Sequence, residues 1–167
     1  INFPLALPVL LILAIDLGTD MIPAIGLGVE SPSKEIMKRK PRNPKAPLCN
    51  WKMIVRSYGF FGPLQTLFSF LVFFHILLSG GWHFSQGVPA LSDPLYMQAV
   101  TGFFATIIIT QMFNVFACRS ARTSVFTKGI FSNKLIWIGI GTEIVLLLTL
   151  IFTPLSLVFG TTGFPVS

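Results

Sequence analysis

Two aspartates lie within an apolar run that is long enough to cross a bilayer. The run extends from Leu5 to about Val29, and Asp16 and Asp20 occupy its middle. A transmembrane helix needs about 20 predominantly apolar residues, and an aspartate at its centre costs about 2.5 to 3.5 kcal/mol on insertion scales. A segment that served only as an anchor would not carry two such residues. The pair therefore indicates a functional site within the membrane.

The spacing of these aspartates places both on one face of a helix. At roughly 100° per residue, side chains four positions apart are one turn from each other, and Thr19 lies beside them. Gly18 weakens this turn, and Pro23 has no N–H to donate to the Thr19 carbonyl. We therefore expect the helix to be unwound in mid-membrane at Gly18–Pro23, with oxygen atoms available to a desolvated hard cation. The alternative is that the aspartates are protonated, or hydrogen-bonded to neighbouring helices in a structural role.

The rest of the chain is also strongly apolar. Its 167 residues are 53% hydrophobic and 11% charged, with a mean hydropathy of +0.77, whereas a soluble domain carries about 25% charged residues. This composition predicts an all-α polytopic membrane protein with four transmembrane helices, at about residues 5–29, 54–78, 95–117 and 135–153. Because the first residue is not Met and no basic leader precedes the apolar run, we expect the chain to be an excised fragment.

The basic residues are confined to two connections between these helices. Eight lie between Lys34 and Arg56, and the other four are Arg119, Arg122, Lys128 and Lys134. If the helices alternate in direction, the positive-inside rule places both connections, residues 30–53 and 118–134, in the cytoplasm and both ends of the chain on the other side. We expect an integral membrane protein, most simply of the plasma membrane. This distribution does not favour nucleic-acid binding, despite the net charge of +6.

Polar side chains recur in the third apolar segment. Thr106, Thr110 and Asn114 repeat every fourth residue, and Gln111 lies beside them. Such a stripe must face protein or water rather than lipid. Two interpretations remain open, either contribution to a cation site or hydrogen bonding between helices.

Single polar residues mark the other two apolar segments. Glu143 is the only charge in the last one, and Gly139, one turn earlier, allows close packing. Because desolvation disfavours the charged form of a carboxyl group, Glu143 indicates either a further cation or proton site or a neutral hydrogen-bonding group. Gln65 in the second segment favours an interhelical hydrogen bond over a ligand.

Several motifs resemble one known family. Asp16-Leu-Gly-Thr-Asp20-Met-Ile-Pro-Ala24, followed by Ile36-Met-Lys-Arg-Lys-Pro-Arg-Asn-Pro-Lys45, resembles the sixth transmembrane helix and the next cytoplasmic loop of P-type cation-transporting ATPases of the second subfamily. Gln111-Met-Phe-Asn114 resembles the eighth helix, and Arg122-Thr-Ser-Val-Phe-Thr-Lys-Gly129 the loop after it. The similarity extends more loosely from the sixth to the ninth helix.

The resemblance implies a pump that couples an aspartyl phosphate to alternating access at a cation site. Its expected cation-binding residues in this chain are Asp16, Thr19, Asp20, Gln111, Asn114 and Glu143. The parent protein would use ATP and Mg²⁺, but this chain has neither a Gly-rich phosphate loop nor an Asp-Lys-Thr-Gly motif, and we expect no catalytic residue in it. The implied partners are the upstream transmembrane helices, the phosphorylation domain and the lipid bilayer. An accessory subunit is left open.

The sequence favours a monovalent cation without excluding other readings. Asp16 and Asp20, with Gln111 and Glu143, look like sodium/potassium or proton/potassium pumps, whereas Asn114 is similar to the calcium pumps. A calcium or other divalent pump is thus the alternative within the family. An alternative of another class is a passive four-helix channel or a membrane scaffold. A channel would spread polar residues along several helices, whereas the acids here cluster near mid-depth.

Overall fold

The computed structural model describes residues 4–32, 36–38, 40, 41, 43, 47, 49–84, 87–90, 92–119 and 129–163. Within these residues every regular element is a helix. Four helical segments are long and apolar enough to cross a membrane, namely Val9–Gly28, Trp51–Ser79, Pro94–Cys118 and Lys134–Phe152. The expected all-α architecture with four spans is confirmed. Parts of both basic connections, including the motif at 122–128, lie outside the described residues.

The first span changes its helical geometry in mid-course. It consists of α1 (Val9–Leu13), a π-helical turn η1 (Ala14–Thr19) and α2 (Met21–Gly28). The Asp20 N–H donates to the Ile15 carbonyl at 3.2 Å, across the five-residue separation of a π-turn. Pro23 lies in the first turn of α2, where a proline is tolerated. The break therefore lies at residues 14–20, earlier than the unwinding expected at Gly18–Pro23, because Pro23 fits the first turn of the regular helix α2.

The second span has a similar break. It consists of α3 (Trp51–Arg56), a π-turn η3 (Ser57–Phe61) and α4 (Gly62–Ser79). The Asn50 side chain begins α3 by accepting a hydrogen bond from the Met53 N–H at 2.9 Å, as an N-cap does.

The third and fourth spans are uninterrupted helices. They are α5 (Pro94–Cys118) and α7 (Lys134–Phe152), the latter followed by the short α8 (Leu155–Phe159). The Asp93 carboxylate accepts from the Leu95 N–H at 2.9 Å and caps α5, with Pro94 in its first turn. Short 3₁₀ turns occur at Ile36–Lys38 (η2) and Ile130–Ser132 (η5).

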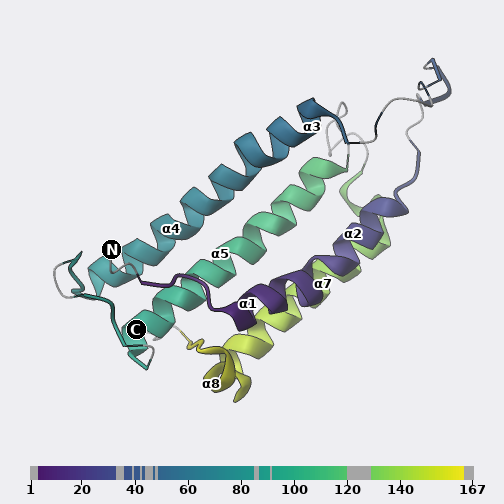
Figure 1. Ribbon diagram of the computed structural model, residues 1–167. Coiled ribbons are helices and arrows are strands. Elements are labelled where there is room, and N and C mark those ends of the chain that lie inside the picture. Colours follow the sequence, from purple (N-terminus) through teal and green to yellow (C-terminus); the bar gives the residue numbers. More distant parts are fainter. Residues whose placement is uncertain are drawn as a thin grey trace.

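The four spans form two packed pairs. In Figure 1, α4 lies along α5, and the first span lies along α7. Helix α5 joins the two pairs, because it also contacts α2 and α7. The α4–α5 interface is aromatic, since Phe73 and Phe104 are fully buried. The rings of Phe70 and Phe103 meet edge to face with centroids 5.1 Å apart, a favourable geometry for aromatic pairs.

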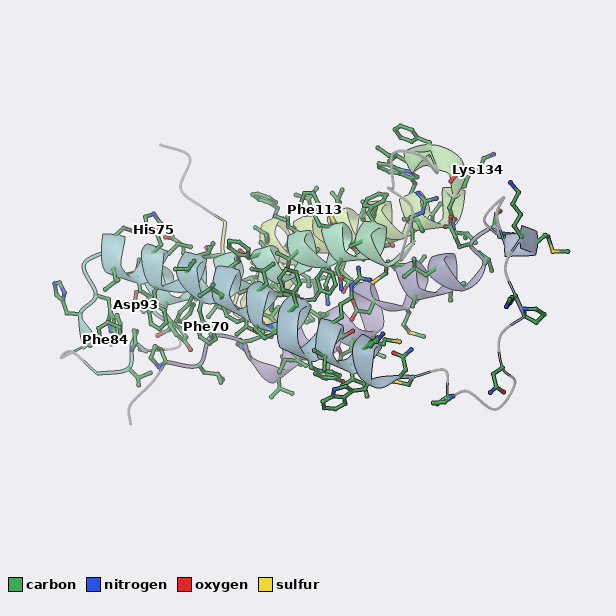
Figure 2. All side chains as sticks on the ribbon, turned by 90° about the horizontal axis from the view of Figure 1, so that it is seen from above. Phe70, His75, Phe84, Asp93, Phe113 and Lys134 are labelled. Carbon is green, nitrogen blue, oxygen red and sulfur yellow. The ribbon has the colours of Figure 1, made fainter. Side chains whose placement is uncertain are left out.

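Different kinds of polar interaction join the helices at the two ends of the bundle. Figure 2 shows Lys134 at one end and Phe84 and Asp93 at the other. The first of these ends, where Glu30 and Arg119 also lie, is called the charged end below. At the opposite end the Tyr96 hydroxyl donates to the Leu5 carbonyl at 2.5 Å. This bond joins two neutral groups.

Candidate functional site

The first span and α7 approach closely where one of them carries a glycine. A Cβ atom on Gly139 would lie 2.9 Å from Pro23 Cγ and 3.0 Å from Pro23 N, and one on Gly18 would overlap the Leu146 side chain. These contacts show that the two helices run antiparallel. Glu143, which lies between Gly139 and Leu146 on α7, therefore faces the segment that separates Gly18 from Pro23. The close packing that the sequence predicted for Gly139 is confirmed.

Glu143 is a buried acidic side chain on the face of α7 that meets the first span. The residue is 1% exposed, and neither of its carboxylate oxygens is hydrogen-bonded among the described residues. Asp20 lies close enough for the two carboxyl groups to interact electrostatically, and Asp16 is within that range of Asp20. Buried carboxyl groups without partners are costly. A bound cation or a proton would remove this cost.

Gln111 connects α5 to the same place. Its Nε2 atom donates to Asp20 Oδ2 at 3.3 Å, and its Oε1 atom is buried with no hydrogen-bond partner in the described part of the chain. Three different spans thus bring Asp20, Gln111 and Glu143 together. The carboxylate and amide oxygens of these side chains are the kind of ligand that hard cations prefer.

Thr19 and Asp16 occupy the π-turn beside this group. Thr19 is fully buried, and its hydroxyl donates to the Ile15 carbonyl of its own helix at 2.7 Å. Asp16 and Asp20, one turn apart, are both exposed on the surface of this chain, but within the described residues only Asp20 is hydrogen-bonded to another span, through Gln111. In the structure, then, Asp20 is the member of the acidic pair that meets the polar faces of other spans.

Asn114 lines a different part of the structure. Together with Gln65, Thr110 and several apolar side chains it borders a groove of about 290 Å³ between α4 and α5. Its Oδ1 atom accepts from Cys118 Sγ at 3.7 Å, and Gln65 Nε2 donates across the helix interface to the Ile107 carbonyl at 3.5 Å. The interhelical hydrogen bond favoured for Gln65 is therefore observed.

The described residues do not form a metal centre of three charged or thiolate ligands. Within the described ranges, no group of three His, Cys, Asp or Glu side chains is arranged to hold a metal ion. The threonines of the polar stripe on α5 bond to their own helix, Thr106 to Gly102 and Thr110 to Thr106. The candidate site of this chain is accordingly two carboxylates and one amide.

A second polar cluster, at the charged end, was not predicted. Arg119 is 6% exposed and forms an ion pair with Glu30, with Nη2 and Oε1 2.9 Å apart. Asn133 donates to Glu30 Oε2 at 2.7 Å and to the Gly26 carbonyl at 2.8 Å. From the sequence alone, Arg119 is one of several basic residues that set the topology. One usable signal was that Glu30, Arg119 and Asn133 each lie at or next to the end of an apolar segment.

Four apolar spans surround carboxylate and amide oxygens that have no hydrogen-bond partner in the described ranges, which defines a polytopic membrane protein with an oxygen-rich site between its helices. The family model described as "Cation transporting ATPase, C-terminus" matches residues 4–167. The chain therefore belongs to the P-type cation-transporting ATPases, of which it matches the C-terminal membrane part.

The chain is also similar to curated sodium/potassium-transporting ATPase subunits. The sodium/potassium-transporting ATPase subunit alpha of Tetronarce californica is 36% identical over an alignment of 177 positions, which covers 92% of this chain and 17% of the relative. Subunit alpha-2 of Bos taurus and subunit alpha-3 of Homo sapiens are each 35% identical with the same coverage. The chain thus spans about one sixth of the length of these relatives.

Proposed function

We propose that residues 1–167 are the C-terminal transmembrane segment of an ATP-driven cation pump and supply part of its cation site. The observation that carries this proposal is the convergence of Asp20, Gln111 and Glu143, with three buried oxygen atoms that lack partners among the described residues. A desolvated cation needs such oxygens and neutralises the carboxylates.

In this proposal the chain's own residues bind and release the cation. Asp20 and Glu143 provide the negative charge, and the Gln111 amide provides a neutral oxygen while its N–H group orients Asp20. Asp16 and Thr19 complete the ligand set together with upstream helices, which would pack against the exposed face that carries Asp16. Asn114, which the sequence placed among the ligands, borders the separate α4–α5 groove and is not assigned to this site.

The rest of the pump would lie outside this chain. ATP and Mg²⁺ would bind to a separate phosphorylation domain, because the chain contains no phosphate-binding or phosphorylation motif. The positive-inside rule supports a cytoplasmic location for the charged end and for both basic connections, at residues 30–53 and 118–134. Plasma-membrane location is the simplest assignment.

A monovalent cation fits the site better than calcium. The curated relatives named above are sodium/potassium-transporting ATPases, and the described site combines two carboxylates with one neutral amide. Calcium usually takes six to eight oxygen ligands, often with several carboxylates. A calcium pump is the alternative that ion titration would reveal.

The test is the cation dependence of ATP hydrolysis by the full-length protein in membranes. Loss of a charged contact worth about 1.5 to 3 kcal/mol raises the half-activating cation concentration by about 10- to 100-fold, which we expect for Asp20→Asn and Glu143→Gln. Asp93→Asn is the matched control, since it makes the same chemical change at the cap of α5. Sodium, potassium and calcium are titrated separately.

Two results would overturn the proposal. Unchanged cation dependence in both site variants would remove Asp20 and Glu143 from the site. Cation flux through the protein without ATP, blocked by the same substitutions, would indicate a passive channel instead of a pump.

A further inference from the structure

The cluster at the charged end joins three spans through one guanidinium group. Arg119, directly after α5, donates to both Glu30 carboxylate oxygens, from Nε at 3.2 Å and from Nη2 at 2.9 Å. Glu30 directly follows the last turn of α2. The same guanidinium donates to the Ile130 carbonyl at 3.0 Å and to Ser132 Oγ at 2.6 Å, in the turn before α7. Nearly all the donor capacity of Arg119 is therefore used.

Asn133 makes the cluster continuous with the helices. Its Oδ1 atom caps α7 by accepting from the Leu135 N–H at 3.1 Å. Its Nδ2 atom donates to Glu30 and to the Gly26 carbonyl at the end of α2. One side chain thus fixes the start of α7 against the end of the first span. We name Glu30, Arg119 and Asn133 the inner clamp.

The inner clamp is mechanically continuous with the candidate cation site. A Cβ atom on Gly26 would lie 3.1 Å from the Ile136 backbone nitrogen, and one turn farther along α7 the Pro23 ring packs against Gly139. Asp20 precedes Gly26 by six residues, or roughly 9 Å of helix at 1.5 Å per residue. Between clamp and site the two helices stay in contact, so that their relative depth is set at the clamp.

The spans joined by the inner clamp are the spans that supply the site. The first span, α5 and α7 carry Asp20, Gln111 and Glu143, respectively. The 3.3 Å bond between Gln111 and Asp20 requires α5 and the first span to keep one axial register. The planar guanidinium fork, which binds a carboxylate through two parallel bonds, fixes such a register in a way that a point charge does not.

We propose that the inner clamp is a positioning device for the cation site, which sets the depth at which Asp20, Gln111 and Glu143 meet. This inference rests on the proposed function of these three residues. It assigns to Arg119 a role that differs from topogenic charge, because a lysine would satisfy the positive-inside rule equally well.

The test compares clamp variants of the full-length protein in membranes. Arg119→Lys keeps the charge but removes the bidentate fork, and Asn133→Ser keeps a capping hydroxyl for α7 but removes the link to Gly26. Because loss of supporting hydrogen bonds behind a ligand typically weakens metal affinity by about 10- to 100-fold, we expect either variant to raise the half-activating cation concentration by about 10-fold. The maximal turnover per phosphorylated enzyme should stay within about twofold of wild type.

A matched control removes charge without touching the clamp. Lys134 is exposed and lies next to Asn133 at the same end of the bundle, so Lys134→Gln should leave cation affinity unchanged. If Arg119→Lys fails to accumulate, Asn133→Ser alone decides the matter.

The outcomes separate this inference from the proposed function. If Asp20→Asn shifts the cation dependence but Arg119→Lys and Asn133→Ser lower only the thermal stability, the clamp is structural and the inference is overturned. If Asp20→Asn and Glu143→Gln also leave the cation dependence unchanged, the proposed site itself is wrong.

Discussion

Two groups of polar side chains lie between the spans of this bundle, and they differ in how completely they are hydrogen-bonded. In the inner clamp, Arg119 and Glu30 meet in a two-pronged ion pair, and each has a further hydrogen-bond partner, Ser132 for Arg119 and Asn133 for Glu30. In the mid-membrane group, both oxygens of Glu143 and one of Gln111 have no partner among the described residues. Satisfied polar networks make a structure rigid, whereas unsatisfied buried groups have a cost that a ligand can offset. The first group therefore fixes the helices relative to one another, and the second group is suited to bind a cation.

The largest effect on stability should come from breaking the complete group. Glu30→Ala leaves the Arg119 guanidinium buried without its counter-charge, which costs about 3 to 5 kcal/mol in comparable cases. We expect a marked fall in the thermal denaturation midpoint of the purified full-length protein. The double variant Glu30→Ala with Arg119→Met should recover part of the loss, because no charge then stays unpaired. A single variant as stable as wild type would contradict the comparison.

A smaller loss is expected where the helices that carry the incomplete group touch. Gly139→Ala places a methyl group against the Pro23 ring and backbone nitrogen, and overpacking of this kind costs about 1 to 3 kcal/mol. Gly141→Ala is the control on the same helix, since a Cβ atom there meets nothing within 4 Å. Thermal denaturation of the two variants measures the difference, and equal midpoints would show that the contact is not tight.

The hydrogen bond between Tyr96 and Leu5, at the opposite end of the bundle, tests whether charge matters to how strongly the helices are held together. Tyr96→Phe removes the hydrogen bond to the Leu5 carbonyl, a change worth about 0.5 to 1.5 kcal/mol. Tyr58→Phe serves as control, because Tyr58 is 80% exposed. A loss from Tyr96→Phe as large as that from Glu30→Ala would show that the ion pair is not special.

The smallest effect on stability is expected in the incomplete group. Glu143→Gln keeps the shape of the side chain and removes a buried carboxylate that makes no hydrogen bond among the described residues. Because that carboxylate contributes no hydrogen bonds within the described residues, the denaturation midpoint should stay the same or rise, even as the half-activating cation concentration increases. A fall in the midpoint comparable to that of Glu30→Ala would show that Glu143 stabilises the helix packing, as Glu30 does.

The sequence predicted the helices because their cause is local. Each span is an apolar run of sufficient length, and a backbone in lipid must satisfy its own hydrogen bonds. The cap at Asp93 has an equally local cause, since an aspartate directly before a proline favours the start of a helix. The exact form of the break in the first span did not follow, because Gly18 and Pro23 weaken a helix without specifying a π-turn at Ala14–Thr19.

The polar contacts depend on packing, and there the sequence was only partly informative. It indicated Asp20, Gln111 and Glu143 individually, since each is conspicuous in an apolar run, and the structure brings them together. It could not separate Asn114 from Gln111, because the two lie on one stripe and only the placement of α4 distinguishes their neighbours. The inner clamp was missed because its residues are far apart in sequence and lie where charge is ordinarily expected.

The contact of Pro23 with Gly139 limits how the bundle can move. The proline ring occupies the space that a side chain at position 139 would fill. The first span and α7 therefore interlock at that level. One helix cannot slide along the other unless the pair first separates. Any displacement of Asp20 toward one membrane face must therefore displace Glu143 in the same direction, so that the two carboxylates move together.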